Sequence, residues 1–179
     1  KGRGFLMPYA LAVSKDNRIF VVGANLIRIV VCDIDEEYLE EFATWYGDNA
    51  GDQTIQTPKD MAFDNSDLLY VVDEGKHTVH VYDTEGKYIR TWGEMGNKPG
   101  QWNGPCGIAF DTENNAYVVD QHNHRIQKYT STGIFLEQWG EFGKEEGQFN
   151  MPWGISIDSI GDVYVADWRN DRIQKFTSE

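Results

Sequence analysis

A short motif that recurs at a nearly constant interval is the strongest constraint on the fold of this chain. Four segments align on a proline: PYALAVS from Pro8, PKDMAFD from Pro58, PCGIAFD from Pro105 and PWGISID from Pro152. Successive prolines are 50, 47 and 47 residues apart. Self-similarity at such a period is the signature of a repeat fold, in which each copy is one supersecondary unit. The sequence therefore predicts four copies of a single module.

Each copy reads as four short strands. In the third copy they are GIAFD, NAYVVDQ, RIQKYT and IFLEQWG, which are rich in β-branched and aromatic residues and separated by TENN, HNH and STG. Such runs bounded by turn residues are typical of β-strands. Four strands in about 47 residues are typical of a β-propeller blade. We expect one all-β propeller domain over residues 1–179, with blades at about 5–50, 55–100, 102–147 and 149–179.

The last copy ends after its third strand, so the last blade is predicted to be incomplete. Two architectures fit this count: an open arc of about four blades, or part of a six-bladed propeller. An open arc exposes unpaired strand edges, which tend to recruit another chain. We therefore expect the protein to self-associate through these edges.

The run GQFNMPWGISIDSIGDVYVADWRNDRIQKF, together with its counterparts, resembles the NHL-repeat β-propellers. The resemblance covers the whole chain and is strongest in residues 58–179. The first copy departs from the pattern, because Gly23 stands where the other copies have aspartate. The resemblance implies blades that usually close in a ring of six, with the first strand of each blade along the central axis.

Polar residues that recur between copies are predicted to serve the architecture. An aspartate ends the second strand, and an arginine follows it by five residues in the last two copies. These residues are Asp73, Asp120, Arg125, Asp167 and Arg172. We expect the carboxylate to accept hydrogen bonds from backbone N–H groups of the hairpin turn, and the arginine to pair with that carboxylate or a neighbouring blade's. A metal site at His122 and His124 is the alternative, but neither histidine recurs in the fourth copy.

The residues that vary between copies are the candidates for ligand binding. Antiparallel pairing places the connection entering the first strand and the hairpin between the second and third strands on one face of the propeller. The residue after each proline lies on this face and has a different chemistry in every copy, as do residues of the nearby hairpins. The candidate binding residues are Tyr9, Lys59, His77, Cys106, His122, Trp153, Trp168 and Arg169. Aromatic residues and arginine are the strongest interface anchors, so this face predicts a protein or peptide partner.

Charge and composition exclude several other classes of function. The net charge of −13 and the pI of about 4.6 disfavour binding to a phosphate backbone, so no nucleic-acid partner is expected. No apolar run approaches the roughly 18 residues of a membrane span. The two cysteines, Cys32 and Cys106, form neither a disulfide framework nor a zinc motif. No cofactor is expected, and nothing in the sequence indicates the cellular compartment.

An enzymatic alternative remains open. The sequence also looks like the peptidylglycine amidating lyases, sharing P-x-x-[LI]-A and D-x-x-N-x-R-I-Q. That resemblance implies a zinc ion held by axial histidines, but none of the four post-proline positions is histidine, so the site is not carried over. A lactonase-type propeller would need an axial calcium cage of Glu, Asn and Asp, which the sequence does not supply. We therefore favour a non-catalytic binding scaffold, with a partial or degenerate six-bladed propeller enzyme of either type as the alternative.

Overall fold

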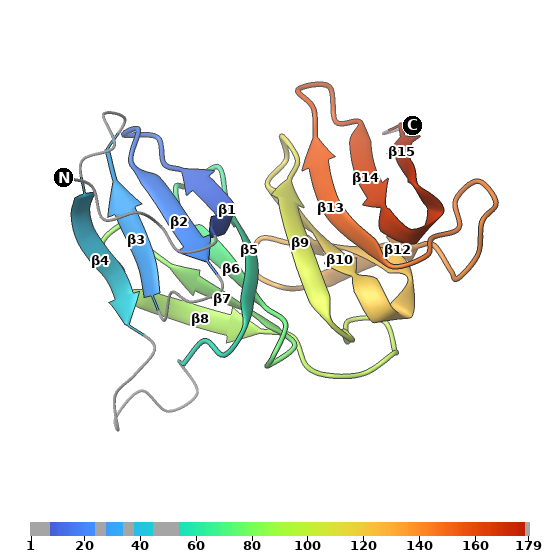
Figure 1. Cartoon of the computed structure of the whole chain (residues 1–179), viewed down its shortest axis with the longest axis horizontal. Helices are drawn as coiled ribbons and strands as arrows, with labels where there is room; N and C mark the ends of the chain where they lie inside the picture. The colour runs from blue at the N-terminus through green and yellow to red at the C-terminus, as the bar shows by residue number, and fades with distance from the viewer. Residues whose placement is uncertain (1–7, 24–27, 34–37, 45–53, 178–179) are drawn as a thin grey trace.

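A computed structural model describes residues 8–23, 28–33, 38–44 and 54–177 of the chain. Within these residues the chain forms four antiparallel sheets, each built from strands that are consecutive in the sequence (Figure 1). The first sheet holds β1 (Pro8–Val13), β2 (Ile19–Gly23), β3 (Arg28–Cys32) and β4 (Tyr38–Thr44). The second holds β5 (Pro58–Phe63), β6 (Leu69–Asp73), β7 (Thr78–Tyr82) and β8 (Tyr88–Trp92).

The third sheet holds β9 (Pro105–Phe110), β10 (Asn115–Asp120), β11 (Arg125–Thr130) and β12 (Phe135–Trp139). The fourth sheet has three strands, β13 (Pro152–Ile157), β14 (Val163–Asp167) and β15 (Arg172–Phe176). Short 3₁₀ turns, η2 (Gln121–Asn123) and η3 (Trp168–Asn170), precede β11 and β15. No helix in the described part of the chain is long and apolar enough to cross a membrane.

The four sheets form an open arc whose inner side is made by the first strand of each sheet (Figure 1). β1 contacts β5, β5 contacts β9, and β9 contacts β13, so the inner strands follow one another around the axis. The proline that begins each inner strand therefore lies near the proline that begins the inner strand of the next sheet. The predictions of an all-β propeller fold, of four-stranded blades and of a three-stranded last blade are confirmed.

The second strands are buried on both faces because each sheet is covered by its neighbours. Every residue of β6 is buried, and β10 is buried from Ala116 to Asp120. A strand covered on both faces shows a continuous apolar run rather than alternation. This explains why these strands contain the continuous apolar runs LYVV and AYVV instead of alternating apolar and polar residues.

Among the described residues, the hydrophobic core is divided into three clusters, each between two adjacent sheets. Phe20 and Leu69 belong to the cluster between the first and second sheets, and Tyr70 and Trp102 to the next. Val119 and Phe149 belong to the cluster between the third and fourth sheets. Each sheet is therefore stabilised mainly by the sheets on either side of it, as in other repeat proteins.

The aspartate that ends the proline segment in the last three copies closes the turn between the first and second strands. Asp111 Oδ1 accepts hydrogen bonds from the backbone N–H groups of Glu113 (3.0 Å) and Asn115 (2.8 Å). Asn114 has a φ of 67°, a left-handed conformation that asparagine tolerates. Asp158 makes the same turn contacts in the fourth sheet, to Ile160 and Asp162. These aspartates thus fix the geometry of their hairpins.

The recurring Asp–Arg pair lies within one blade. Arg125 Nε donates to Asp120 Oδ2 at 2.7 Å, and the guanidinium also donates to the carbonyl oxygens of Lys98 and Gln101 at 2.9 Å. Arg172 and Asp167 repeat this pair at 2.8 Å. The arginine therefore binds its own blade's carboxylate and the connection that arrives from the previous blade.

The prediction that the carboxylate accepts from backbone N–H groups of the hairpin turn is confirmed for Asp73 and wrong for Asp120 and Asp167. Asp120 Oδ1 accepts from the backbone N–H of Asn103 (2.7 Å) and Asp167 Oδ1 from Asn150 (2.7 Å), both in the entering connection, not in the hairpin turn. Asp73 also accepts from backbone N–H groups of its own turn, at Gly75 (3.0 Å) and Lys76 (3.3 Å). Asp120 and Asp167 accept from their turns only through the side chains of Asn123 and Asn170. The η2 and η3 turns explain the difference, since neither is capped by the aspartate side chain that precedes it.

Candidate binding site on the axial loop face

The face that carries the proline-containing connections and the β6–β7, β10–β11 and β14–β15 hairpins is called the axial face here. The four post-proline residues lie on it at the start of the inner strands. Two of them bind the next inner strand. The Tyr9 hydroxyl donates to the Pro58 carbonyl, and Cys106 Sγ donates to the Trp153 carbonyl at 3.3 Å.

Cys106 is buried, which removes it from the surface that a ligand could touch. Burial also raises the pKa of its thiol, with a further contribution from the nearby carboxylate of Asp60. A neutral, enclosed thiol is a poor nucleophile and a poor metal ligand. Of the four post-proline residues, Cys106 is therefore the one that is buried and inaccessible to a ligand.

Two other post-proline residues, Lys59 and Trp153, form a connected group with residues of the nearby hairpins. The Lys59 ammonium lies 3.1 Å from a Glu74 carboxylate oxygen and 5.7 Å from the centre of the Trp153 ring. Trp153 meets Trp168 edge to face, with ring centroids 5.9 Å apart, and the Arg169 guanidinium lies 5.3 Å from the Trp168 ring. We call Lys59, Glu74, Trp153, Trp168 and Arg169 the axial cluster.

Both tryptophans of the axial cluster remain accessible. Trp153 is 47% exposed and Trp168 is 53% exposed, although side chains of this size dominate buried cores. Arg169 is exposed, and the ring of Trp168 is its side-chain contact in the described structure. An exposed aromatic pair flanked by two cations is therefore available on a protein whose overall charge is strongly negative.

The two histidines predicted to bind a ligand have different environments. His77 Nδ1 accepts a hydrogen bond from the backbone N–H of Gly104 in the next sheet, at 3.1 Å. His124 makes the same contact to Met151, also at 3.1 Å, and both histidines have φ near 55°. These two contacts form an inter-blade clasp, which leaves His77 engaged in the architecture. His122 is exposed, and its ring covers Gly104 so closely that a Cβ there would lie 2.3 Å from His122 Cδ2.

Asp60 is an axial residue that sequence reasoning missed. It occupies the second position after Pro58, where the other copies have Ala10, Gly107 and Gly154. Its Oδ1 accepts from the backbone N–H of Met61 (2.9 Å), and its Oδ2 from that of Ile108 in the next sheet (3.0 Å). Burial raises the pKa of this carboxyl from 3.8 to about 6, against those two hydrogen bonds. The signal in the sequence is an acid at a position where the other copies have alanine or glycine.

The position after the recurring aspartate also varies in a way that the structure explains. Glu74 pairs with Lys59, the buried Gln121 donates to the Pro152 carbonyl at 3.3 Å, and Trp168 packs on Trp153. Across the described residues, no group of three or more His, Cys, Asp or Glu side chains is arranged to hold a metal ion. The axial face thus presents exposed aromatic and charged side chains to solvent.

Comparisons with known proteins agree with the fold. The profile of a 6-bladed beta-propeller family matches residues 51–140, and that of the NHL repeat matches residues 149–176. No curated protein sequence matches the chain. Solved structures match over nearly its whole length at low sequence identity.

A streptogramin B lyase structure aligns with a TM-score of 0.70 at 15% identity, over 96% of this chain and 51% of the other. The virginiamycin B lyase from Staphylococcus aureus gives 0.68 at 14% identity, over 96% of this chain and 53% of the other. A protein of unknown function from Bacteroides thetaiotaomicron gives 0.74 at 16% identity, over 95% and 47%. The chain thus spans about half the length of these structures.

Proposed function

Since this chain belongs to the 6-bladed beta-propeller family, we propose that it is a non-catalytic propeller module that binds a protein or peptide through its axial face. The observation that carries the proposal is the exposed pair Trp153–Trp168, with the Arg169 guanidinium against the Trp168 ring. Interfaces are enriched in tryptophan and arginine at the few positions that contribute most of the binding energy. The likeness to lyases shows the fold alone and transfers no activity.

The charges of the axial cluster favour one kind of ligand. Glu74 compensates the charge of Lys59, whereas the guanidinium of Arg169 lies against the Trp168 ring without a carboxylate partner among the described residues. A guanidinium on a tryptophan face can still donate to a carboxylate in its own plane. The ligand that fits is a peptide segment with an apolar or aromatic side chain for the tryptophans and a carboxylate for Arg169.

The enzymatic alternative would place its chemistry on the same axis. Asp60 has a pKa near 6 and could in principle exchange a proton, but both its oxygens already accept backbone hydrogen bonds. The Cys106 thiol is buried and donates to backbone carbonyls. These contacts support an architectural role for both groups, and a binding module needs neither of them as a reactant.

A random peptide library selected against the immobilised chain tests the proposal. Selected peptides should bind the Trp168→Ala variant about 30-fold more weakly, because a truncated interface anchor costs about 2 kcal/mol. Leu136→Ala is the matched control, since Leu136 is also an exposed apolar side chain but lies on the outermost strand β12. Peptides that bind wild type, Trp153→Ala and Trp168→Ala equally well would contradict an axial binding site.

A further inference from the structure

The peptide group between Asn103 and Gly104 is held at both ends by polar groups of neighbouring segments. These two residues are the only Asn–Gly pair in the sequence, and they lie in the connection that enters β9. The Gly104 N–H donates to His77 Nδ1 at 3.1 Å, and the Asn103 carbonyl accepts from the His122 N–H at 3.0 Å. The peptide group therefore has a basic nitrogen beside its N–H and a hydrogen-bond donor at its oxygen.

The side-chain carboxamide of Asn103 is not held in this way. Asn103 is half-buried and lines a hollow of about 370 Å³. Asn123, on the same hollow, donates to the Gly96 carbonyl at 2.9 Å and to the Asp120 carboxylate at 2.9 Å. The Asn103 carboxamide has no hydrogen-bond partner among the described residues. It can therefore turn toward its own backbone, and the hollow lets water enter and a small product leave.

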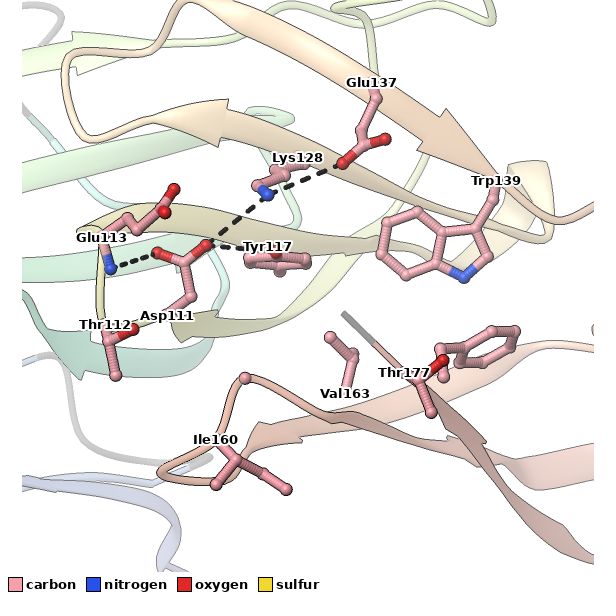
Figure 2. A pocket seen from close by; sticks show the side chains of 12 residues that line it. Asp111, Thr112, Glu113, Tyr117, Lys128, Glu137, Trp139, Ile160, Val163 and Thr177 are labelled. Atoms are coloured by element: carbon pink, nitrogen blue, oxygen red, sulfur yellow. Dashed lines mark hydrogen bonds and ion pairs between the residues drawn. The ribbon is translucent and has the colours of Figure 1, made fainter. Parts of the chain in front are cut away.

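A second hollow, between the third and fourth sheets, contains polar groups that are bound to one another (Figure 2). Asp111 Oδ2 accepts from the Tyr117 hydroxyl at 3.1 Å and lies 3.6 Å from Lys128 Nζ. Tyr164 and Asp158 repeat the tyrosine–aspartate contact in the fourth sheet, also at 3.1 Å. Groups that recur and are paired serve the architecture, which leaves the unpaired carboxamide of the first hollow as the candidate for a reaction.

The contacts of the peptide group favour attack of the Gly104 nitrogen on the Asn103 side chain. A base can take a proton when it lies within hydrogen-bond reach, about 2.6–3.2 Å, and His77 Nδ1 meets this condition at 3.1 Å. Loss of the proton places negative charge on the peptide oxygen, where the His122 N–H stabilises it. The nitrogen and the side-chain carbonyl carbon belong to adjacent residues, so their encounter is intramolecular.

We infer that Asn103–Gly104 is a self-modification site. The Gly104 nitrogen bonds to Asn103 Cγ and gives its proton to His77 Nδ1. The C–N bond of the carboxamide then breaks, and the proton leaves with the amide nitrogen as ammonia, so a cyclic succinimide remains. One water molecule opens the ring at either carbonyl and produces aspartate or isoaspartate at position 103. The reaction needs only water, and it is independent of the peptide binding proposed for the axial face.

The fourth blade contains a matched peptide group that differs in one residue. Asn150–Met151 takes the place of Asn103–Gly104 and repeats its backbone contacts at the same distances. The contacts are Asn150 N–H to Asp167 Oδ1 (2.7 Å), Met151 N–H to His124 Nδ1 (3.1 Å) and Arg169 N–H to the Asn150 carbonyl (3.0 Å). Methionine has a Cβ beside the attacking nitrogen, whereas glycine has none. Asn103 should therefore react much faster than Asn150.

The products should weaken the joint between the second and third blades. The Asn103 N–H donates to the buried carboxylate of Asp120 at 2.7 Å, so the new negative charge forms close to an existing one. Isoaspartate also adds a carbon atom to the main chain, which displaces Gly104 from His77. The modified chain should therefore unfold at a lower temperature than the unmodified chain.

The test follows the full chain in neutral buffer made with heavy-oxygen water, with peptide mass spectrometry at each asparagine. Asn103 should convert with uptake of heavy oxygen, and faster than in the synthetic peptide QWNGPCG of residues 101–107, which lacks both histidines. His77→Asn keeps a residue type that tolerates the φ of 56° but removes the base. Because a positioned general base contributes about 10²–10⁴-fold, this variant should convert at least about tenfold more slowly.

Met151→Gly should transfer the reaction to the fourth blade. Met151 has a φ of 53°, which glycine adopts without strain, so the variant should fold and convert Asn150 at a rate close to that of Asn103. Conversion of Asn103 in the folded chain at or below the rate of the peptide would overturn the inference. An unchanged rate in His77→Asn, or equal rates at Asn103 and Asn150 in the wild type, would overturn it as well.

Discussion

Ionisation of Asp60 should make the protein less stable at neutral pH than at mildly acidic pH. The carboxyl is held by burial at a pKa of about 6, against 3.8 when it is freely solvated. At 1.36 kcal/mol per pH unit, this difference corresponds to roughly 3 kcal/mol. Because the native state binds the proton more tightly, the stabilising contribution is complete below about pH 3.8 and is lost as pH rises through about 6.

The Asp60→Asn variant replaces the ionisable group by a neutral one that resembles its protonated form. The amide nitrogen replaces one of the two acceptor oxygens, which costs the same stability at every pH, but the free energy of unfolding of the variant should rise relative to that of wild type as pH increases. Linkage predicts that the advantage of Asp60→Asn grows by about 1.4 kcal/mol between about pH 5 and about pH 8. Urea unfolding followed by tryptophan fluorescence measures both proteins at each pH, and the difference between them cancels the titration of all other groups.

Asp158→Asn serves as a control of opposite sign. Hydrogen bonds from Asp162, Ile160 and Tyr164 outweigh the desolvation of Asp158 and lower its pKa. Its contribution is present above the unfolded pKa and is lost in acid, so Asp158→Asn should be the less stable protein at neutral pH. A difference between wild type and Asp60→Asn that is constant from about pH 5 to about pH 8, or that shrinks as pH rises, would refute the reasoning about Asp60.

Three further predictions concern the framework. Arg125→Ala leaves the buried Asp120 carboxylate without its cation, so it should lower the free energy of unfolding in urea by about 3–5 kcal/mol. A loss under about 1 kcal/mol would show that the ion pair is dispensable. His124→Ala loses an inter-blade hydrogen bond and puts alanine at positive φ, so it should lower the stability by about 1–2 kcal/mol. His124→Asn should retain most of the stability, and equal thermal midpoints for the two variants would contradict this role of His124. Cys106 should resist iodoacetamide in the native protein and react after denaturation, as peptide mass spectrometry can determine; rapid native alkylation would contradict its burial.

The blades could be predicted from the sequence because their determinants are local. Proline starts, β-branched runs and turn residues recur in register, and every copy supports the interpretation of the others. The pairing of Arg125 with Asp120 is local too, since it spans a single hairpin. The contact of Asp120 with Asn103 was missed because it joins the hairpin to a connection that packs against it only in the folded blade.

The axial face was only partly predictable for the same reason. Trp153 and Trp168 stood out as residues that break the repeat, and the structure shows that their rings meet and remain exposed. His77 stood out equally, but its partner belongs to the next blade. Its alignment with His124 and Asp171 was a usable signal, because histidine and aspartate both tolerate the left-handed conformation that these positions adopt.

The inter-blade clasp also gives the folding of this chain a direction. His77 receives its hydrogen from Gly104, and His124 from Met151, so in both cases the acceptor precedes its donor by 27 residues. On the ribosome, the β10–β11 hairpin can therefore form as soon as its own residues emerge, but its histidine stays unsatisfied until the following connection leaves the exit tunnel. At these two joints the blade that is made later thereby locks the one made before it, so the joint that is still open lies at the carboxy-terminal end of the growing chain.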